Sequence, residues 1–219
     1  GFPLVDSVVR RSFIATGGTV LATKLALNYG IACNTAGGSH HATSNEGAGF
    51  CVFNDVAVAA KYLTSRGLAN KILIIDLDVH QGNGNSEIFK NDNQVFTFSM
   101  HSKVNYPAKK SVSDLDIELE ENLEDREYID ILKNNLKYLN EEEFDFVFYI
   151  AGVDIHYNDR LGKLKISDNG IFERDELVID NFFSNKIPIC GVLGGGYNED
   201  FNKLVELHSS LHKTCAKFL

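Results

Sequence analysis

A carboxylate and an imidazole stand two residues apart at Asp78 and His80, directly after a run of apolar residues at 72–75. In an extended segment, residues i and i+2 point to the same side, so these two side chains could hold one metal ion. A third ligand from another part of the chain would still leave one coordination position open for water, as catalytic zinc requires. Asp154, which follows the apolar run 144–150, is the best candidate for this third ligand.

The aspartates at these positions also have a purely structural interpretation. Asp76 and Asp78 are suited to capping the helix that follows them, and Asp154 alone is as well suited to a cap as to a metal ion. The metal interpretation gains weight from two further features of the same sequence. These are an adjacent pair of histidines at 40–41 and three consecutive glycines followed by Tyr197.

The elements that must position these residues are visible as short apolar runs that alternate with amphipathic stretches. This alternation indicates parallel βαβ units, and in such sheets ligands bind beyond the carboxyl ends of the strands. We predict strands at 31–35, 71–76, 94–99, 144–150 and 187–193, with a short one at 117–119. We predict helices at 4–28, 54–65, 84–90, 125–140, 168–183 and 199–218. The pair Gly17-Gly18 inside the first helix marks either a kink or a close contact.

Composition limits the classes of protein that remain. The 219 residues are 44% apolar and 23% charged, which is ordinary for a chain that folds around its own core. Because domains typically hold roughly 100–200 residues, we predict a single domain at 1–219. No stretch approaches the ~20 consecutive apolar residues of a membrane span, and no signal peptide is recognisable, so we expect no membrane partner.

The charge and the cysteines point to a cytoplasmic protein, or to a nuclear one if the source is eukaryotic. The formal net charge of −9 argues against direct binding to nucleic-acid phosphates. The four cysteines are widely spaced and form no C-x-x-C motif, which is typical of reduced, mostly buried thiols. They are Cys33, Cys51, Cys190 and Cys215.

Five short segments form an ordered set along the chain. They are 37–41 (GGSHH), 49–55 (GFCVFND), 76–84 (DLDVHQGNG), 151–154 (AGVD) and 194–197 (GGGY). Their order and spacing resemble those of the histone deacetylase family, and the resemblance covers nearly the whole chain. The residues at 82–84 and 159–162 are most similar to the class IV branch of the family and its bacterial relatives.

The resemblance implies the arginase/deacetylase fold, a three-layer αβα arrangement around a mostly parallel central sheet. Family members carry a segment before the stretch that begins near Gly1, so the resemblance also implies a catalytic domain shortened at its N-terminus. We therefore expect edge strands of the family's sheet, or loops of its pocket, to be missing from this chain.

The resemblance also implies a zinc-dependent hydrolase that removes acyl groups from amines such as acetyl-lysine. Asp78, His80 and Asp154 would hold one Zn²⁺, which would polarise a water molecule and the substrate carbonyl. His41 would be the general base that activates the water, and then the acid that protonates the leaving amine.

Four further residues receive roles from the same resemblance. His40 would be an electrostatic partner of the base, with Asp76 orienting it. Tyr197 would donate a hydrogen bond to the developing oxyanion. Asn83 would be the partner of His41 at a position where many family members have Asp, so His41 is expected to lack the help of a negative charge.

The substrate channel and a second ion are also implied by resemblance. Gly49 and Phe50 would form one wall of an acyl-lysine channel, with Leu161 and Tyr106 at its mouth. Phe50 taken alone is more typical of a core residue than of a channel wall. A structural K⁺ or Na⁺ would be bound near the zinc by the side chains of Asp76 and Ser99 and the carbonyls of Asp78, His80 and Met100.

Three alternatives remain open. An arginase-like enzyme with two Mn²⁺ ions shares the implied fold, but its bridging carboxylates would fall at Gly82 and His156, which carry none. A non-catalytic module that binds acyl-lysine would keep the same pocket. The substrate could also be an acetylpolyamine or a small acetylated metabolite rather than a protein, and the oligomeric state is not indicated.

Overall fold

A sheet of six parallel strands forms the centre of the molecule, a computed structural model that describes residue 3 and residues 5–218. The strand order is β1-β6-β5-β2-β3-β4, and every neighbouring pair is parallel. The strands are β1 (Ile31–Cys33), β2 (Ile72–Asp76), β3 (Val95–Ser102), β4 (Leu115–Leu119), β5 (Phe146–Ile150) and β6 (Ile189–Val192). The helices are α1 (Asp6–Tyr29), α2 (Asp55–Ser65), α3 (Asn83–Phe89), α4 (Asp125–Leu139), α5 (Asp168–Phe183) and α6 (Phe201–Cys215).

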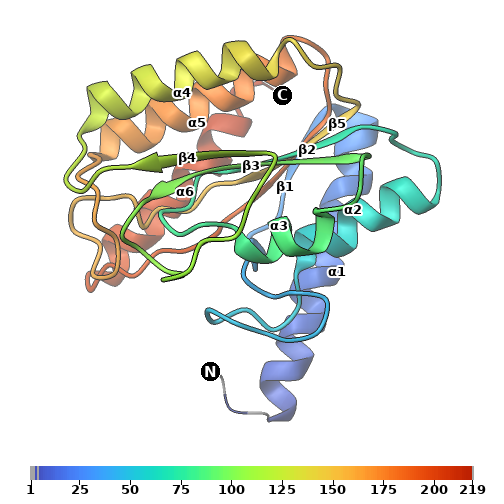
Figure 1. The fold of residues 1–219 in the computed structure, drawn as a ribbon, viewed down its shortest axis with the longest axis horizontal. Helices are drawn as coiled ribbons and strands as arrows, with labels where there is room; N and C mark the ends of the chain where they lie inside the picture. The colour runs from blue at the N-terminus through green and yellow to red at the C-terminus, as the bar shows by residue number, and fades with distance from the viewer. Residues whose placement is uncertain (1–2, 4, 219) are drawn as a thin grey trace.

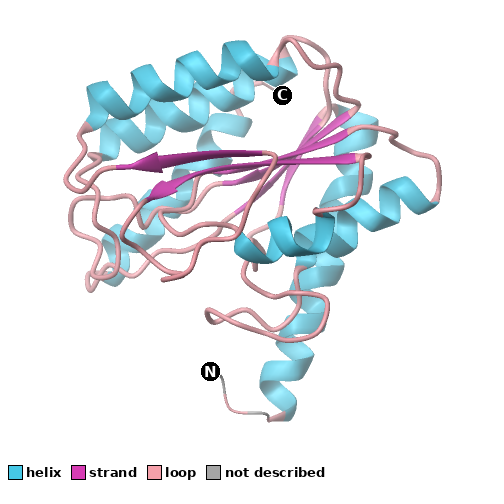
Figure 2. Ribbon diagram, viewed as in Figure 1, coloured by secondary structure: helices cyan, strands magenta, loops and turns pink. Residues whose placement is uncertain are grey.

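Helices cover both faces of this sheet, as the alternation of side chains along β2 shows. Leu73 and Ile75 pack into one core with buried residues of α4, α5 and α6. Ile72 and Ile74 point the other way and pack with α1 and α2. Figure 1 shows α4 and α5 side by side over one face and α1 and α2 across the other, and Figure 2 shows the strands as one layer between them. The predicted three-layer αβα fold is confirmed.

Helix α1 runs without interruption through the glycine pair in its middle. A Cβ atom on Gly18 would lie 2.9 Å from Asn34 Nδ2, whereas one on Gly17 would have no neighbouring atom within 4 Å. The pair therefore marks a close contact between α1 and the segment after β1, not a kink. The predicted start of this helix at Leu4 lies outside the described residues.

All six strands differ by one to three residues from the lengths predicted for them, and β1 and β4 illustrate the two directions. β1 ends at Cys33 instead of residue 35, because the Asn34 side chain donates to Ala15 O and Thr19 Oγ1 of α1, both at 3.0 Å. β4 has five residues, two more than predicted. The prediction was too short because Leu115 and Ile117 alternate with acidic residues in this edge strand. Such alternation is a weaker signal than the continuous apolar runs of the central strands.

The carboxyl ends of the parallel strands meet at one edge of the sheet. Asp76, the last residue of β2, is the register partner of Ser99 in β3 and of Ile150 in β5. The polar segments that follow β1, β2, β5 and β6 therefore come together at this edge. No helix in the described part of the chain is long and apolar enough to cross a membrane.

Candidate active site

Asp78, His80 and Asp154 converge at the carboxyl edge of the sheet, as the sequence predicted. The three side chains are buried, and each offers a ligating atom within 4.8 Å of the other two. His80 Nδ1 lies 3.0 Å from Asp78 Oδ1 and 3.1 Å from Asp154 Oδ2. Two carboxylates and one imidazole with this spacing could hold a single metal ion.

The backbone around these residues fixes the carboxylates. The Val79 N–H donates to Asp154 Oδ1 at 2.9 Å, and the Gly195 N–H donates to Asp78 Oδ2 at 2.6 Å. Residues 78–80 form a bend after β2, so the extended conformation predicted for this triplet is wrong. The bend still turns Asp78 and His80 toward the same point, because the Asp154 carboxylate holds the backbone between them.

None of the three aspartates considered as helix caps has that role. α3 begins after Gly82, which makes no side-chain capping bond. The cap of α5 is Ser167, whose hydroxyl accepts from the Gly170 N–H. The carboxylates of Asp76, Asp78 and Asp154 instead point at the histidines and backbone N–H groups of the site.

The electrostatics of the triad fit a bound cation. Burial and the nearby charge of Asp78 raise the pKa of Asp154 to about 7. The charges of His40 and His80 outweigh burial and hold the pKa of Asp78 well below its usual range. Burial lowers the pKa of His80, but its bonds to Asp154 and Asp78 outweigh this effect and raise it to about 10. Two carboxylates this close, buried and facing one imidazole, are a donor set that suits a divalent metal ion.

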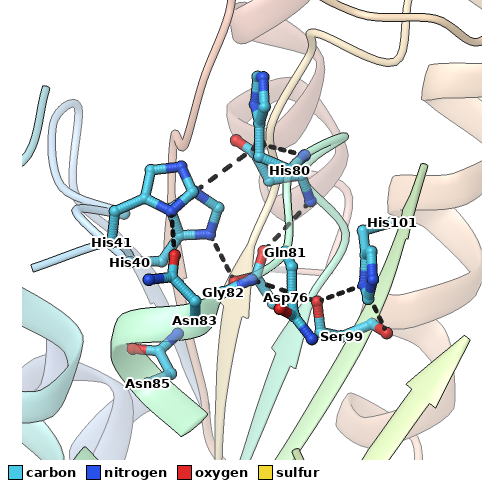
Figure 3. Close-up of polar contacts among 12 residues, drawn as sticks. His40, His41, Asp76, His80, Gln81, Gly82, Asn83, Asn85, Ser99 and His101 are labelled. Carbon is cyan, nitrogen blue, oxygen red and sulfur yellow. Dashed lines mark hydrogen bonds and ion pairs between the residues drawn. The ribbon is translucent and has the colours of Figure 1, made fainter. Parts of the chain in front are cut away.

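His40 is bonded to a carboxylate. Its Nδ1 lies 2.6 Å from Asp76 Oδ2, and its Nε2 lies 3.8 Å from Asp78 Oδ1 (Figure 3). Burial alone would lower the pKa of His40, but the charges of Asp76 and Asp78 outweigh burial and raise the pKa to about 9. At neutral pH, His40 is therefore an imidazolium.

His41 is bonded to an amide. Its Nδ1 lies 2.6 Å from Asn83 Oδ1, the first residue of α3 (Figure 3). Since an amide oxygen only accepts, His41 Nδ1 carries the hydrogen and Nε2 has a free lone pair. Burial and the charge of His40 lower the pKa of His41 to about 3. The second histidine of the pair is therefore neutral at the same pH.

Tyr197 follows the glycine-rich segment after β6 and lies over the triad. Its ring centroid is 6.2 Å from that of His80 and 6.1 Å from that of Phe50. Burial and the charges of Asp78 and Asp154 raise its pKa, so the phenol keeps its proton and can donate a hydrogen bond.

A cavity of about 650 Å³ opens beside these residues. The residues predicted to bind substrate, Gly49, Phe50 and Leu161, all line it, and so do Tyr106, His41, His80 and Tyr197. Phe50 is 57% exposed, so the interpretation of this residue as core is wrong. Gly49 has a φ of +50°, and a Cβ atom there would clash with the ring of His41. Only glycine therefore lets the wall approach the histidine so closely.

The sequence did not predict the role of Asp159 in joining two walls of this cavity. Its Oδ2 accepts the Tyr197 N–H at 2.7 Å, and its Oδ1 accepts the N–H groups of Leu161 and Gly162 at 2.9 Å. One carboxylate thus fixes both the tyrosine and the segment that carries Leu161. In the sequence, this position was marked only by the similarity of residues 159–162 to the class IV branch.

Arg174 is a second residue whose place the sequence did not predict. Its fully buried guanidinium donates to the carbonyls of Gly152 and Ala151 at 2.5 and 3.4 Å, and pairs with Asp175 at 2.8 Å. These bonds hold the backbone directly before Asp154. A charged residue on an amphipathic helix gives no sequence signal for such a contact.

Comparison with known proteins identifies the family of the chain. The family model described as the histone deacetylase domain matches residues 1–211. An uncharacterized protein of Picosynechococcus sp. is 49% identical over 97% of this chain and 71% of its own length. Histone deacetylase 2 of Arabidopsis thaliana is 36% identical over 86% of this chain and 50% of its own length. The chain belongs to the histone deacetylase family, and its likeness to that family is confirmed.

A solved structure supports the fold. The acetylpolyamine aminohydrolase from Burkholderia pseudomallei superposes with a TM-score of 0.82 at 20% identity, over 95% of this chain and 63% of that one. The chain thus spans between half and three quarters of the length of these three proteins.

Proposed function

We propose that this protein is a zinc-dependent hydrolase that removes acetyl or longer acyl groups from amines, with acyl-lysine in proteins as the substrate class. The observation that carries the proposal is the convergence of three groups on one cavity. These are the Asp-His-Asp triad, a neutral histidine and a protonated tyrosine. Membership of the histone deacetylase family supports the same reaction.

Asp78, His80 and Asp154 would hold the zinc ion. Zinc, when bound in a site with an open position, supplies a Lewis acid for a carbonyl oxygen and lowers the pKa of water. The buried donor set of two carboxylates and one imidazole supports this assignment. The N–H groups of Val79 and Gly195 would keep the carboxylates in place whether or not the metal is bound.

His41 would move the protons of the reaction. Because Asn83 accepts its Nδ1 hydrogen, the lone pair of Nε2 can take a proton from the attacking water. The same nitrogen would then give that proton to the leaving amine. The lowered pKa keeps His41 neutral at pH 7, so the Nε2 lone pair is free before the reaction begins, but it also makes His41 a weaker base.

His40 and Tyr197 would stabilise the negative charge that develops on the substrate oxygen. His40 remains an imidazolium beside Asp76, and its ring centroid lies 4.0 Å from that of His41. Tyr197 would donate a hydrogen bond to the oxyanion from the other side of the triad. The hydrogen bond that the Tyr197 N–H donates to Asp159 supports a fixed position for the residue that carries the phenol.

The cavity would receive the acyl-lysine side chain. Phe50 and Leu161 line it from two different loops, and Gly49 allows close approach to His41. The resemblance to the class IV branch suggests that longer acyl chains are removed better than acetyl. An assay across acyl lengths, on lysine peptides and on acetylated polyamines, separates this proposal from a polyamine or small-metabolite deacetylase.

Three further predictions remain proposals: a bound monovalent cation, a single catalytic domain and a cytoplasmic location. A K⁺ or Na⁺ ion would bind near Asp76, Ser99 and the carbonyls of Asp78, His80 and Met100. The pairing of Asp76 with Ser99 in adjacent strands supports it. The chain would act as one catalytic domain in the cytoplasm.

The metal assignment is tested by metal analysis and turnover together. The purified chain should contain about one zinc per molecule, and Asp154→Ala should lose both zinc and deacylation, because one of three ligands is gone. Asp180→Ala, a change at an exposed aspartate of α5, is the matched control and should retain both. Stoichiometric zinc in Asp154→Ala would show that the ligand assignment is wrong. A chain that holds zinc and a hydroxamate but turns over no acylated amine would be a binding module.

A further inference from the structure

Two cysteines far apart in the sequence lie in contact at the edge of the sheet. Cys33 is the last residue of β1, and Cys215 is the last residue of α6. Their sulfur atoms are 3.0 Å apart, although 182 positions separate them in the chain. All four cysteines are free thiols; Cys190 lies in the adjacent strand β6, but it packs into the core on the opposite face of the sheet from Cys215. A disulfide bond is roughly 2.05 Å long, so a movement of about 1 Å would join this pair.

The strand next to β1 makes room for this contact. Cys33 is the register partner of Gly191 in β6. A Cβ atom on Gly191 would lie 3.0 Å from Cys33 Sγ and 3.2 Å from Leu211 of α6. Any larger residue there would stand between the strand and the helix. The missing side chain thus lets the Cys33 thiol reach α6.

The two sulfur atoms are unequal in chemistry and exposure. The hydrogen bond from the Cys215 thiol and the nearby His212 outweigh burial and lower the pKa of Cys33 to about 6. The lowered pKa favours the thiolate of Cys33, which is the nucleophilic form. Its side chain is half-buried, whereas Cys215 is only 6% exposed. A small oxidant would thus reach Cys33 first.

We propose that Cys33 and Cys215 are a site of reversible oxidation, at which a hydroperoxide forms a disulfide that joins β1 to α6. The Cys33 thiolate attacks one oxygen atom of the hydroperoxide and the O–O bond breaks. The transferred oxygen forms a sulfenic acid, and the other oxygen takes up a proton from solvent and leaves as water or an alcohol. The Cys215 sulfur then forms the S–S bond, and the sulfenic oxygen leaves with the Cys215 proton as water. The two thiols lose two electrons, and the peroxide gains them.

The disulfide would restrain the unfolded chain. It closes a loop of 182 positions, and disulfides that close long loops stabilise the most in the chain-entropy model. We expect the melting temperature of the oxidised chain to rise by about 5–15 °C. Reduction with dithiothreitol should return it to the original value. The proposal does not depend on deacylase activity, so it is tested without a substrate.

Hydrogen peroxide, added in small excess to the full chain, provides the test. The number of titratable thiols in the denatured chain should fall from four to two. Glutamyl endopeptidase cleaves at Glu46, which separates Cys33 from Cys51, so mass spectrometry should identify one Cys33–Cys215 linked peptide. Cys215→Ser should stop at a sulfenic acid on Cys33 that dimedone traps. Cys190→Ala is the control and should still form the bond.

Three outcomes would overturn the proposal. They are four thiols remaining after treatment, a linked peptide that contains Cys51 or Cys190, and a covalent dimer as the main product. The mass spectrum of the oxidised chain without substitutions decides between these outcomes even if a variant fails to fold.

Discussion

Two adjacent histidines occupy nearly the same environment but differ in the residue that each contacts. His40 and His41 are both buried, and each has its Nδ1 2.6 Å from a side-chain oxygen. For His40 this oxygen belongs to the Asp76 carboxylate, and for His41 it belongs to the Asn83 amide. The pKa is raised to about 9 in the first pair and lowered to about 3 in the second.

The comparison shows that charge, not hydrogen-bond length, sets the protonation of these histidines. A carboxylate stabilises the imidazolium, whereas an amide orients the ring and adds no charge. His40 also affects its neighbour, because its charge disfavours a second charge on His41, whose ring centroid lies 4.0 Å from that of His40. The site thus holds one imidazolium and one neutral imidazole side by side.

Removal of the neutral base should have the largest effect on turnover. We expect His41→Ala to lower kcat by about 10²–10⁴-fold, since this is the usual contribution of a positioned general base. The measurement is the steady-state rate on an acyl-lysine peptide, with zinc content as the control. His40→Ala should lower kcat less, because it removes charge stabilisation but leaves the base. An equal or larger loss in His40→Ala would reverse the roles given to the pair.

Removal of the tyrosine hydroxyl should have the next largest effect. Tyr197→Phe keeps the ring beside His80 and Phe50 but removes the proposed oxyanion donor. We expect kcat to fall by about 10²–10³-fold, the usual loss for one such donor. The pH dependence should keep its acidic limb, because His41 is unchanged. If turnover in Tyr197→Phe is unchanged, the tyrosine has no part in the reaction.

The carboxylate of Asp159 offers a smaller and more selective test. Asp159→Asn can keep the bonds from Leu161 and Gly162 to Oδ1, but it places an N–H₂ group opposite the Tyr197 N–H. We expect kcat to fall by about 3–30-fold, in line with the loss of one charge-assisted bond.

A double-mutant cycle checks that this effect passes through the tyrosine hydroxyl. In the Tyr197→Phe background, Asp159→Asn should change kcat very little, since the group that it positions is already absent. The two effects would multiply if Asp159 acted independently of Tyr197, and that result would remove its positioning role.

The sequence predicted the strands because they rest on short-range patterns, and it predicted the triad from the positions at which two of those strands end. Continuous apolar runs marked β2 and β5, and the polar residues after them had to meet at one edge of a parallel sheet. The edge strand β4 was predicted too short, because its apolar residues alternate with acidic ones. The bend at 78–80 depends on the hydrogen bond that the Val79 N–H donates to Asp154, 75 positions away, which no local pattern contains.

Two residues of the site were missed for a related physical reason. Asp159 and Arg174 act on backbone N–H and carbonyl groups of distant segments. Backbone groups are the same in every residue, so their partners leave no pattern of residue types. Contacts between side chains, such as those of Asp76 and Asn83 with the histidine pair, could instead be expected from the family resemblance.

The pH–rate profile of Asn83→Asp tests the central claim most directly. The base must be neutral to act, so activity is lost as the pH falls through its pKa, and a raised pKa moves this acidic limb upward. Aspartate is nearly isosteric with asparagine and adds one negative charge beside His41 Nδ1, which raises the histidine pKa. We predict that the acidic limb of kcat/KM moves to higher pH in Asn83→Asp, with zinc content unchanged. A limb that stays in place or moves to lower pH would contradict the account, because either Asn83 would not set the pKa of His41 or His41 would not be the base.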